Sequence, residues 1–108
     1  MANTFKSNVA ANIVTSGNTV YTCPSSTQTT LIGLTIANKS GSTVTANAFV
    51  TRSSVDYAII ANAPILPGST LVPVGGDQKV VLQAADVLKV TTSANGSVDV
   101  IASLLEIS

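Results

Sequence analysis

Clusters of turn-forming residues divide this sequence into short segments of strand length. They lie at residues 16–18, 24–26, 38–42, 67–69, 75–77 and 94–97. Gly adopts positive φ, Pro fixes φ, and Asn or Ser side chains bond to their own backbone, so such clusters mark chain reversals. Short apolar segments between closely spaced turns are typical of a β-sandwich or a barrel, and this spacing constrains the fold more than any other feature.

Alternation of side chains within these segments predicts strands with one buried face. The even-numbered residues are apolar in segments 44–50 and 98–104, so we expect them to lie on the buried face. We expect the even-numbered residues of segment 31–36 to lie on the buried face as well. The end of the last segment is apolar on both faces, which is expected either of a central strand or of an interface.

Helix is poorly supported, because the best window, residues 83–88, is too short to nucleate alone. We interpret residues 79–90 as two strands joined by a tight turn at 84–86, and Gly75-Gly76 as a hairpin turn. Pro73 restricts its segment to a sheet edge or a strand end. The sequence therefore predicts an all-β, antiparallel sandwich, Ig-like or jelly-roll-like, with about seven to nine short strands and little or no helix.

The length of 108 residues fits one domain. We expect residues 16–108 to form a single sandwich. Residues 1–15 are predicted to be an N-terminal arm that orders on a neighbour, or an edge strand, because terminal segments are loose unless they are tied down.

The side chains that perform most catalysis are scarce. The chain has no histidine, and its five acidic residues are scattered, so neither an acid–base pair nor a catalytic site is expected. No loop carries two acids for calcium, and Cys23 alone cannot hold zinc. We interpret Cys23 as a small apolar residue at a strand end. The sequence predicts no enzyme, no cofactor and no metal site.

Charge and hydropathy also limit the partners. The net charge is zero and no basic stripe exists, so a nucleic-acid partner is not expected. No apolar run reaches the length of a membrane helix, and the start does not resemble a secretory signal, so we expect neither a membrane partner nor secretion. The sequons at Asn38 and Asn95 are interpreted as turns.

Apolar residues near the chain ends and in one loop are candidates for contacts between subunits. Ile65 and Leu66 lie in a proline-bounded loop and must be covered, either within the fold or by a partner. The predicted interface residues are Phe5, Val9, Ile13, Ile65, Leu66, Leu104, Leu105 and Ile107.

Several segments resemble, in their order and spacing, small β-sandwich virion proteins of tailed bacteriophages. They are VYTCP at 20–24, LIGL at 31–34, GGDQKVVL at 75–82, AADVLKV at 84–90 and VDVIASLLEI at 98–107. They cover most of the chain beyond about residue 18. Such proteins often have Gly where Ala85 stands, so a positive φ at this turn would strain Ala85.

The resemblance implies a non-enzymatic virion subunit assembled in the host cytoplasm. It favours capsid decoration or cement, with a neck, tail or fibre-base component as the alternative. The implied partners are the chain itself, with a trimer favoured, and the major capsid protein or other virion proteins. A carbohydrate- or receptor-binding module is the alternative of another class, and it predicts exposed Tyr or clustered Asp and Asn at one loop end.

Overall fold

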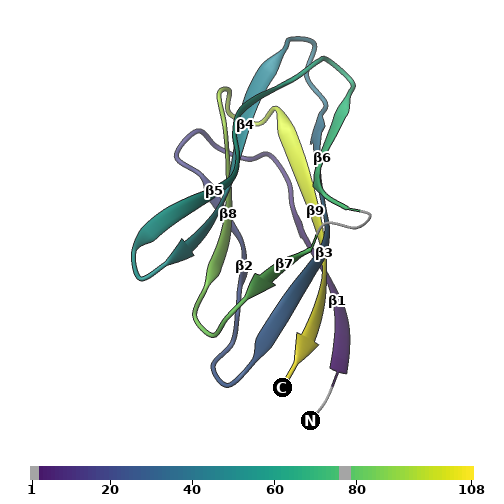
Figure 1. Ribbon diagram of the computed structural model, residues 1–108. Helices are drawn as coiled ribbons and strands as arrows, with labels where there is room; N and C mark the ends of the chain where they lie inside the picture. The colour runs from purple at the N-terminus through teal and green to yellow at the C-terminus, as the bar shows by residue number, and fades with distance from the viewer. Residues whose placement is uncertain (1–2, 76–78) are drawn as a thin grey trace.

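The chain folds into two facing antiparallel sheets, as the computed structural model in Figure 1 shows. The structure describes residues 3–75 and 79–108. The strands are β1 (Asn3–Ala10), β2 (Asn18–Thr22), β3 (Gln28–Asn38), β4 (Val44–Arg52), β5 (Val55–Ile65), β6 (Thr70–Val74), β7 (Val80–Leu82), β8 (Val87–Thr92) and β9 (Val98–Ile107). These nine strands, without a helix in the described ranges, confirm the predicted all-β sandwich. No described helix is long and apolar enough to span a membrane.

The strand order shows how the chain wraps. One sheet has the order β1-β9-β3-β6, with β7 also paired to β3, and the other has the order β2-β8-β4-β5. Strand β6 pairs with β3 at residues 34–37, and β7 pairs with β3 at residues 29–31. β6 and β7 therefore follow one another along a single edge of β3 and share one strand position. Both strands run antiparallel to β3, so β6 and β7 have the same direction and do not pair with each other. The prediction of a hairpin turn at Gly75-Gly76 is therefore wrong, and residues 76–78 themselves lie outside the described residues.

This wrapping is that of a jelly roll. Within the described chain, only β4 and β5 are both consecutive and directly paired. Apart from the step from β6 to β7, every other connection crosses from one sheet to the other. An Ig-like sandwich pairs several consecutive strands, whereas a jelly roll has eight strand positions in two sheets connected by crossings. Of the two sandwich types that the sequence allowed, the topology matches the jelly roll.

The core lies between the sheets and follows the predicted alternation with one exception. The even-numbered residues of segments 44–50 and 98–104 are buried in the core or packed against it. In β3 a register shift against β9 lies between Leu31 and Gly33, so Ile32 is the extra residue of a bulge. Leu31 is therefore fully buried and Ile32 only partly buried. The prediction that Ile32 shares the core face of this segment is wrong, because the bulge interrupts the alternation.

A buried tyrosine links the two sheets. The Tyr21 hydroxyl of β2 lies 2.8 Å from Thr29 Oγ1 of β3 and donates a hydrogen bond to Glu106 Oε2 of β9. Lys6 Nζ lies 3.5 Å from the same carboxylate oxygen. Burial, followed by the hydrogen bond to Glu106, raises the pKa of Tyr21 above its usual range. The cluster keeps the tyrosine neutral and satisfies polar groups inside the sandwich.

The predicted turn between β7 and β8 is present, and it is tied to its surroundings. Ala85 has φ of 73°, the left-handed backbone that strains a residue with a Cβ. Its N–H donates to the Cys23 carbonyl at 2.9 Å. The Asp86 carboxylate accepts hydrogen bonds from the Gln83 N–H and from the Arg52 guanidinium. Hydrogen bonding to Arg52 is the largest cause that lowers the pKa of Asp86. The Arg52 side chain at the end of β4 and the Cys23 carbonyl thus hold a strained turn in place.

Candidate interaction surface

The register between β1 and β9 gathers apolar side chains on the outer face of their sheet. Phe5 pairs with Leu105, and Val9 pairs with Ile101. Directly opposed residues point to the same face. The even-numbered residues of β9 from 98 to 104 point into the core, so its odd-numbered residues, which include Ile107, point outward. We call Phe5, Val9, Ile101, Leu105 and Ile107 the outer patch.

The outer patch is largely open to solvent. Phe5 is 76% exposed, Val9 70% and Ile101 51%, while Leu105 and Ile107 are half-buried. Ser7 pairs with Ser103, between the apolar pairs Phe5–Leu105 and Val9–Ile101. Along the two described strands, the outward positions carry one charged residue, Asp99. These apolar side chains adjoin one another and carry little charge between them, so they form a continuous exposed patch rather than scattered surface residues.

A closed polar cluster borders the outer patch near the start of β9. Asp99 Oδ1 accepts a hydrogen bond from the Asn12 N–H at 3.0 Å and lies 3.0 Å from Lys39 Nζ. Lys39 Nζ also donates to Asn12 Oδ1 at 2.6 Å. The backbone hydrogen bond from Asn12, followed by that from Lys39, lowers the pKa of Asp99. The Asp99 carboxylate, the one carboxylate on this face of β1 and β9, is thus neutralised by its neighbours. The polar cluster around Asp99 marks the end of the outer patch near the start of β9.

The structure brings four of the eight predicted interface residues into the outer patch. They are Phe5, Val9, Leu105 and Ile107. They come from opposite ends of the chain, and the pairing of β1 with β9 makes them neighbours. Their role in an interface stays a prediction, now with a defined face of one sheet as its location.

The other four predicted interface residues lie elsewhere. Ile13, Ile65 and Leu104 are buried in the core, so their side chains are covered within the chain and present no surface. Ile13 is also fixed by its backbone, since its N–H donates to the Val98 carbonyl at 3.0 Å. Leu66 is exposed in the loop between β5 and β6. The prediction that Ile65 lies in a loop is wrong, because Ile65 is the last residue of β5 and is covered within the fold, whereas Leu66 lies beyond the strand and is exposed.

Sequence reasoning missed Ile101, a central member of the outer patch. The signal was present, because Ile101 lies on the same alternating face as Leu105 and Ile107. Val81 of β7 was missed as well. It pairs with Thr30, which in turn pairs with Leu105, so it continues one row of the patch toward the far edge of the sheet.

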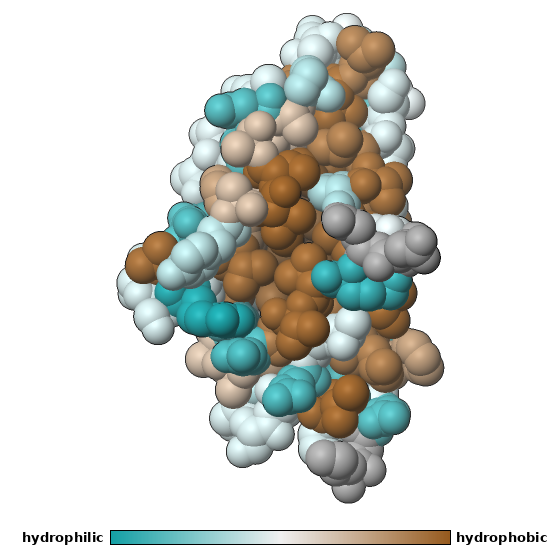
Figure 2. Space-filling model, in the orientation of Figure 1, coloured by the Kyte–Doolittle hydropathy of each residue, from teal (hydrophilic) through white to brown (hydrophobic). Residues whose placement is uncertain are grey.

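A second apolar region lies along the side where the edge strands β5 and β6 face each other. Figure 2 shows apolar side chains running down the middle of this side. Ile59, Ile60, Leu71 and Val80 are partly buried here and pack against the core. Because these side chains already pack within the chain, they are the exposed margin of the core rather than a separate patch.

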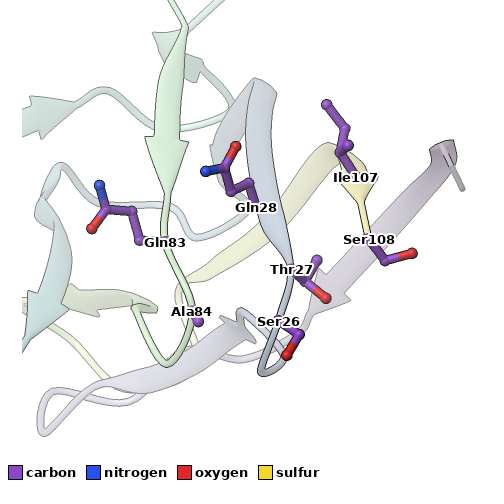
Figure 3. A pocket seen from close by; sticks show the side chains of 7 residues that line it. All are labelled: Ser26, Thr27, Gln28, Gln83, Ala84, Ile107 and Ser108. Carbon is purple, nitrogen blue, oxygen red and sulfur yellow. The ribbon is translucent and has the colours of Figure 1, made fainter. Parts of the chain in front are cut away.

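Two open depressions on the surface are large enough to hold a small ligand. The larger, about 470 Å³, is lined by Ser26, Thr27, Gln28, Gln83, Ala84, Ile107 and Ser108 (Figure 3). None of these residues has a titratable side chain. The smaller, about 410 Å³, is lined by Val50, Arg52, Tyr57 and Val81. Among the described residues, no group of three or more His, Cys, Asp or Glu side chains is placed to hold a metal ion.

Comparison with known proteins relates the fold to one solved structure. No protein-family model matches the sequence, and no curated protein is significantly similar to it. The chain is similar to a protein chain in the crystal structure of the T13 IBDV viral particle, with a TM-score of 0.52 and 9% identity. The likeness covers 96% of this chain and 30% of that chain. At this identity, the likeness supports the fold alone.

Proposed function

We propose that this protein is a non-enzymatic structural subunit of a virus particle and that the outer patch packs against neighbouring subunits. The observation that carries the proposal is the exposure of Phe5, Val9 and Ile101 side by side on a sheet face with almost no charge. Covering this area stabilises a contact by roughly 25 cal/mol per Å² of apolar surface, before the costs of association.

The fold agrees with this role. Jelly rolls occur in viral capsid domains and in lectins. The solved chain that resembles this one belongs to a viral particle, although it is much longer. Neither of the two depressions offers an acid–base pair, which favours a packing role over catalysis.

The finer assignment draws on the sequence resemblance to tailed-phage virion proteins. We assign the protein to bacteriophage capsid decoration or cement, with itself and the major capsid protein as partners. A neck, tail or fibre-base position on the same particle is the alternative. The same patch serves either location, because each requires an apolar face that is covered on assembly.

Electron microscopy of particles labelled with an antibody against this protein tests the role and distinguishes the two positions. Label spread over the shell supports decoration, and label confined to one vertex or to the tail supports the alternative. Shells assembled without the protein are then expected to release their genome at a lower temperature. Purified particles that carry no label and contain none of the protein by mass spectrometry would contradict the proposal.

One observation favours a carbohydrate-binding module as a second candidate. Tyr57 is 57% exposed and lines the smaller depression beside Arg52. An exposed aromatic ring offers an apolar face to a sugar, and a neighbouring guanidinium offers hydrogen-bond donors. A glycan array probed with the wild-type protein and with Tyr57→Ala tests this candidate. Binding that disappears in the variant supports it, and the absence of binding by the wild type rejects it.

A further inference from the structure

The free edge of β1 is an unprotected sheet edge. β1 pairs with β9 at eight consecutive positions without a register shift. Residues 3–10 contain no proline and no residue with positive φ. An edge strand presents a row of unpaired N–H and C=O groups, and a long regular edge readily pairs with another strand.

The other edge strands carry the features that prevent such pairing. β2 has five residues and a register shift between Thr19 and Tyr21. β5 contains Pro64 and the positive-φ residue Asn62. β6 contains Pro73, and β7 has three residues. Proline, bulges and short length are the usual protection of natural sheet edges, so β1 differs from the rest of the described fold.

A charged side chain on β1 could supply the missing protection, but the one it has is engaged elsewhere. Lys6 Nζ lies 3.5 Å from the Glu106 carboxylate and 6.0 Å from the centre of the Tyr21 ring. Lys6 pairs with Leu104, whose side chain points into the core, so Lys6 lies on the inner face of the sheet. An inward-pointing charge can itself protect a sheet edge, but this ammonium is paired with Glu106 and keeps that counter-ion when a second strand approaches.

We infer that β1 pairs antiparallel with β1 of a second copy, about a two-fold axis at Ser7. The two sheets then form one continuous sheet across the dimer. A contact of this kind joins the same surface of both copies and closes on itself. It goes beyond the proposed virion role, because it specifies a contact between two copies that exists in the absence of a particle.

The sequence of β1 selects this register. The outward residues of both copies stay on one face only if the two-fold axis passes through a residue and not between two residues. Among such axes, those at Lys6 and at Ser7 give the longest overlap of the two β1 strands. An axis at Lys6 places two lysines opposite each other, which is unfavourable. An axis at Ser7 places Phe5 opposite the partner's Val9 and Lys6 opposite the partner's Asn8. Pairs of an aromatic and a β-branched residue stabilise antiparallel strands.

The dimer also enlarges the outer patch. Phe5 and Val9 of both copies meet in the middle of the joined sheet, so the two outer patches form one apolar surface. This contact has two-fold symmetry and therefore differs from the trimer that the sequence resemblance implied. A trimer would have to use other surfaces of the subunit.

A charge-swap pair tests the register in solution. The double variant Phe5→Lys, Val9→Lys places lysine opposite lysine at both outer positions, whereas Phe5→Lys, Val9→Glu places lysine opposite glutamate. Both variants remove the same exposed apolar side chains, so they differ only in charge pairing. By sedimentation velocity, we expect a dimer for the wild type and for the Lys/Glu variant, and a monomer for the Lys/Lys variant. A monomeric wild type, or equal dimerisation of the two variants, overturns the inference.

Disulfide trapping tests the axis independently of those substitutions. In the proposed register, Ser7→Cys faces the same residue of its partner, so mild oxidation is expected to give a covalent dimer. Thr4→Cys faces Ala10 of the second copy and is expected to give no covalent dimer under the same conditions. The wild type controls for Cys23, which is buried. Equal cross-linking of the two cysteine-substituted variants, or none of Ser7→Cys, contradicts an axis at Ser7.

Discussion

Phe5 in β1 lies directly opposite Leu105 in β9, and Phe5 is 76% exposed while Leu105 is half-buried. The pair sits on the outer face, opposite the side on which the even-numbered residues of β9 fill the core. Neighbouring leucines of β9 therefore have different surroundings, one inside the sandwich and one in the outer patch. Folding and assembly depend on different faces of the same strand, and the two can be separated by mutation.

Two adjacent leucines test this separation. Leu104→Ala removes a fully buried side chain and is expected to destabilise the protein by about 2–5 kcal/mol, because it leaves a cavity. Leu105→Ala removes a half-buried side chain of the outer patch and is expected to cost less than about 1.5 kcal/mol. Chemical denaturation of both variants gives the free energies of unfolding. Equal losses would show that the two faces of β9 are not assigned correctly.

The hydroxyl of Tyr21 is expected to stabilise the contact between the sheets. Tyr21→Phe keeps the ring but removes the hydrogen bonds to Thr29 and Glu106, so we expect a loss of about 1–3 kcal/mol. Tyr57→Phe is the matched control, because Tyr57 is exposed, and it is expected to change stability by no more than about 0.5 kcal/mol. Thermal unfolding compares the two. If both variants unfold like the wild type, the buried hydroxyl contributes nothing to stability.

The backbone strain at Ala85 predicts a stabilising substitution. Ala85→Gly relieves the left-handed conformation at φ 73° and is expected to stabilise the protein by roughly 0.5–1 kcal/mol, after the entropy cost of glycine. Ala84→Gly in the same turn has no such strain to relieve and is expected to destabilise by a similar amount. Denaturant midpoints of the two variants should therefore shift in opposite directions. A shift of both to lower denaturant would contradict the strain at Ala85.

Acid is expected to weaken the turn through Asp86. Hydrogen bonding to Arg52 holds the folded-state pKa of Asp86 below its ordinary value of 3.8. The ionised carboxylate therefore contributes stability above that value, and this contribution is lost as the pH falls through the lower, folded-state pKa. Asp86→Asn is expected to cost about 1–3 kcal/mol at pH 7 and less at pH 2. Unfolding curves of the wild type and the variant across this pH range measure the difference between their free energies of unfolding. A difference that grows in acid would contradict a stabilising, ionised Asp86.

The sequence predicted the class of fold because turn chemistry and alternation are local properties. Segments 44–50 and 98–104 show period-two alternation that the core preserves. The bulge at Leu31–Gly33 was not predictable from alternation, because the extra residue is apolar like its neighbours. The choice between jelly roll and Ig-like sandwich depends on which strands pair, and pairings such as β1 with β9 join distant parts of the chain.

The candidate surface was only partly predictable for the same reason. Ile65 and Leu66 are both apolar loop residues in sequence, yet one fills the core and the other is exposed. Phe5 and Val9 could be suspected as contacts, but their pairing with Leu105 and Ile101 follows only from the register. The hydrogen bond between Tyr21 and Glu106 likewise joins residues that no sequence pattern relates.

Binding of the purified protein to particles assembled without it tests the central claim most directly. Co-sedimentation should show that the wild type pellets with the particles at a saturating, fixed stoichiometry. Ile101→Glu should remain in the supernatant while keeping the unfolding temperature of the wild type. Val55→Glu is the matched control at an exposed position of β5 and should still pellet. The account is contradicted if the wild type stays in the supernatant, or if Ile101→Glu binds as well as Val55→Glu.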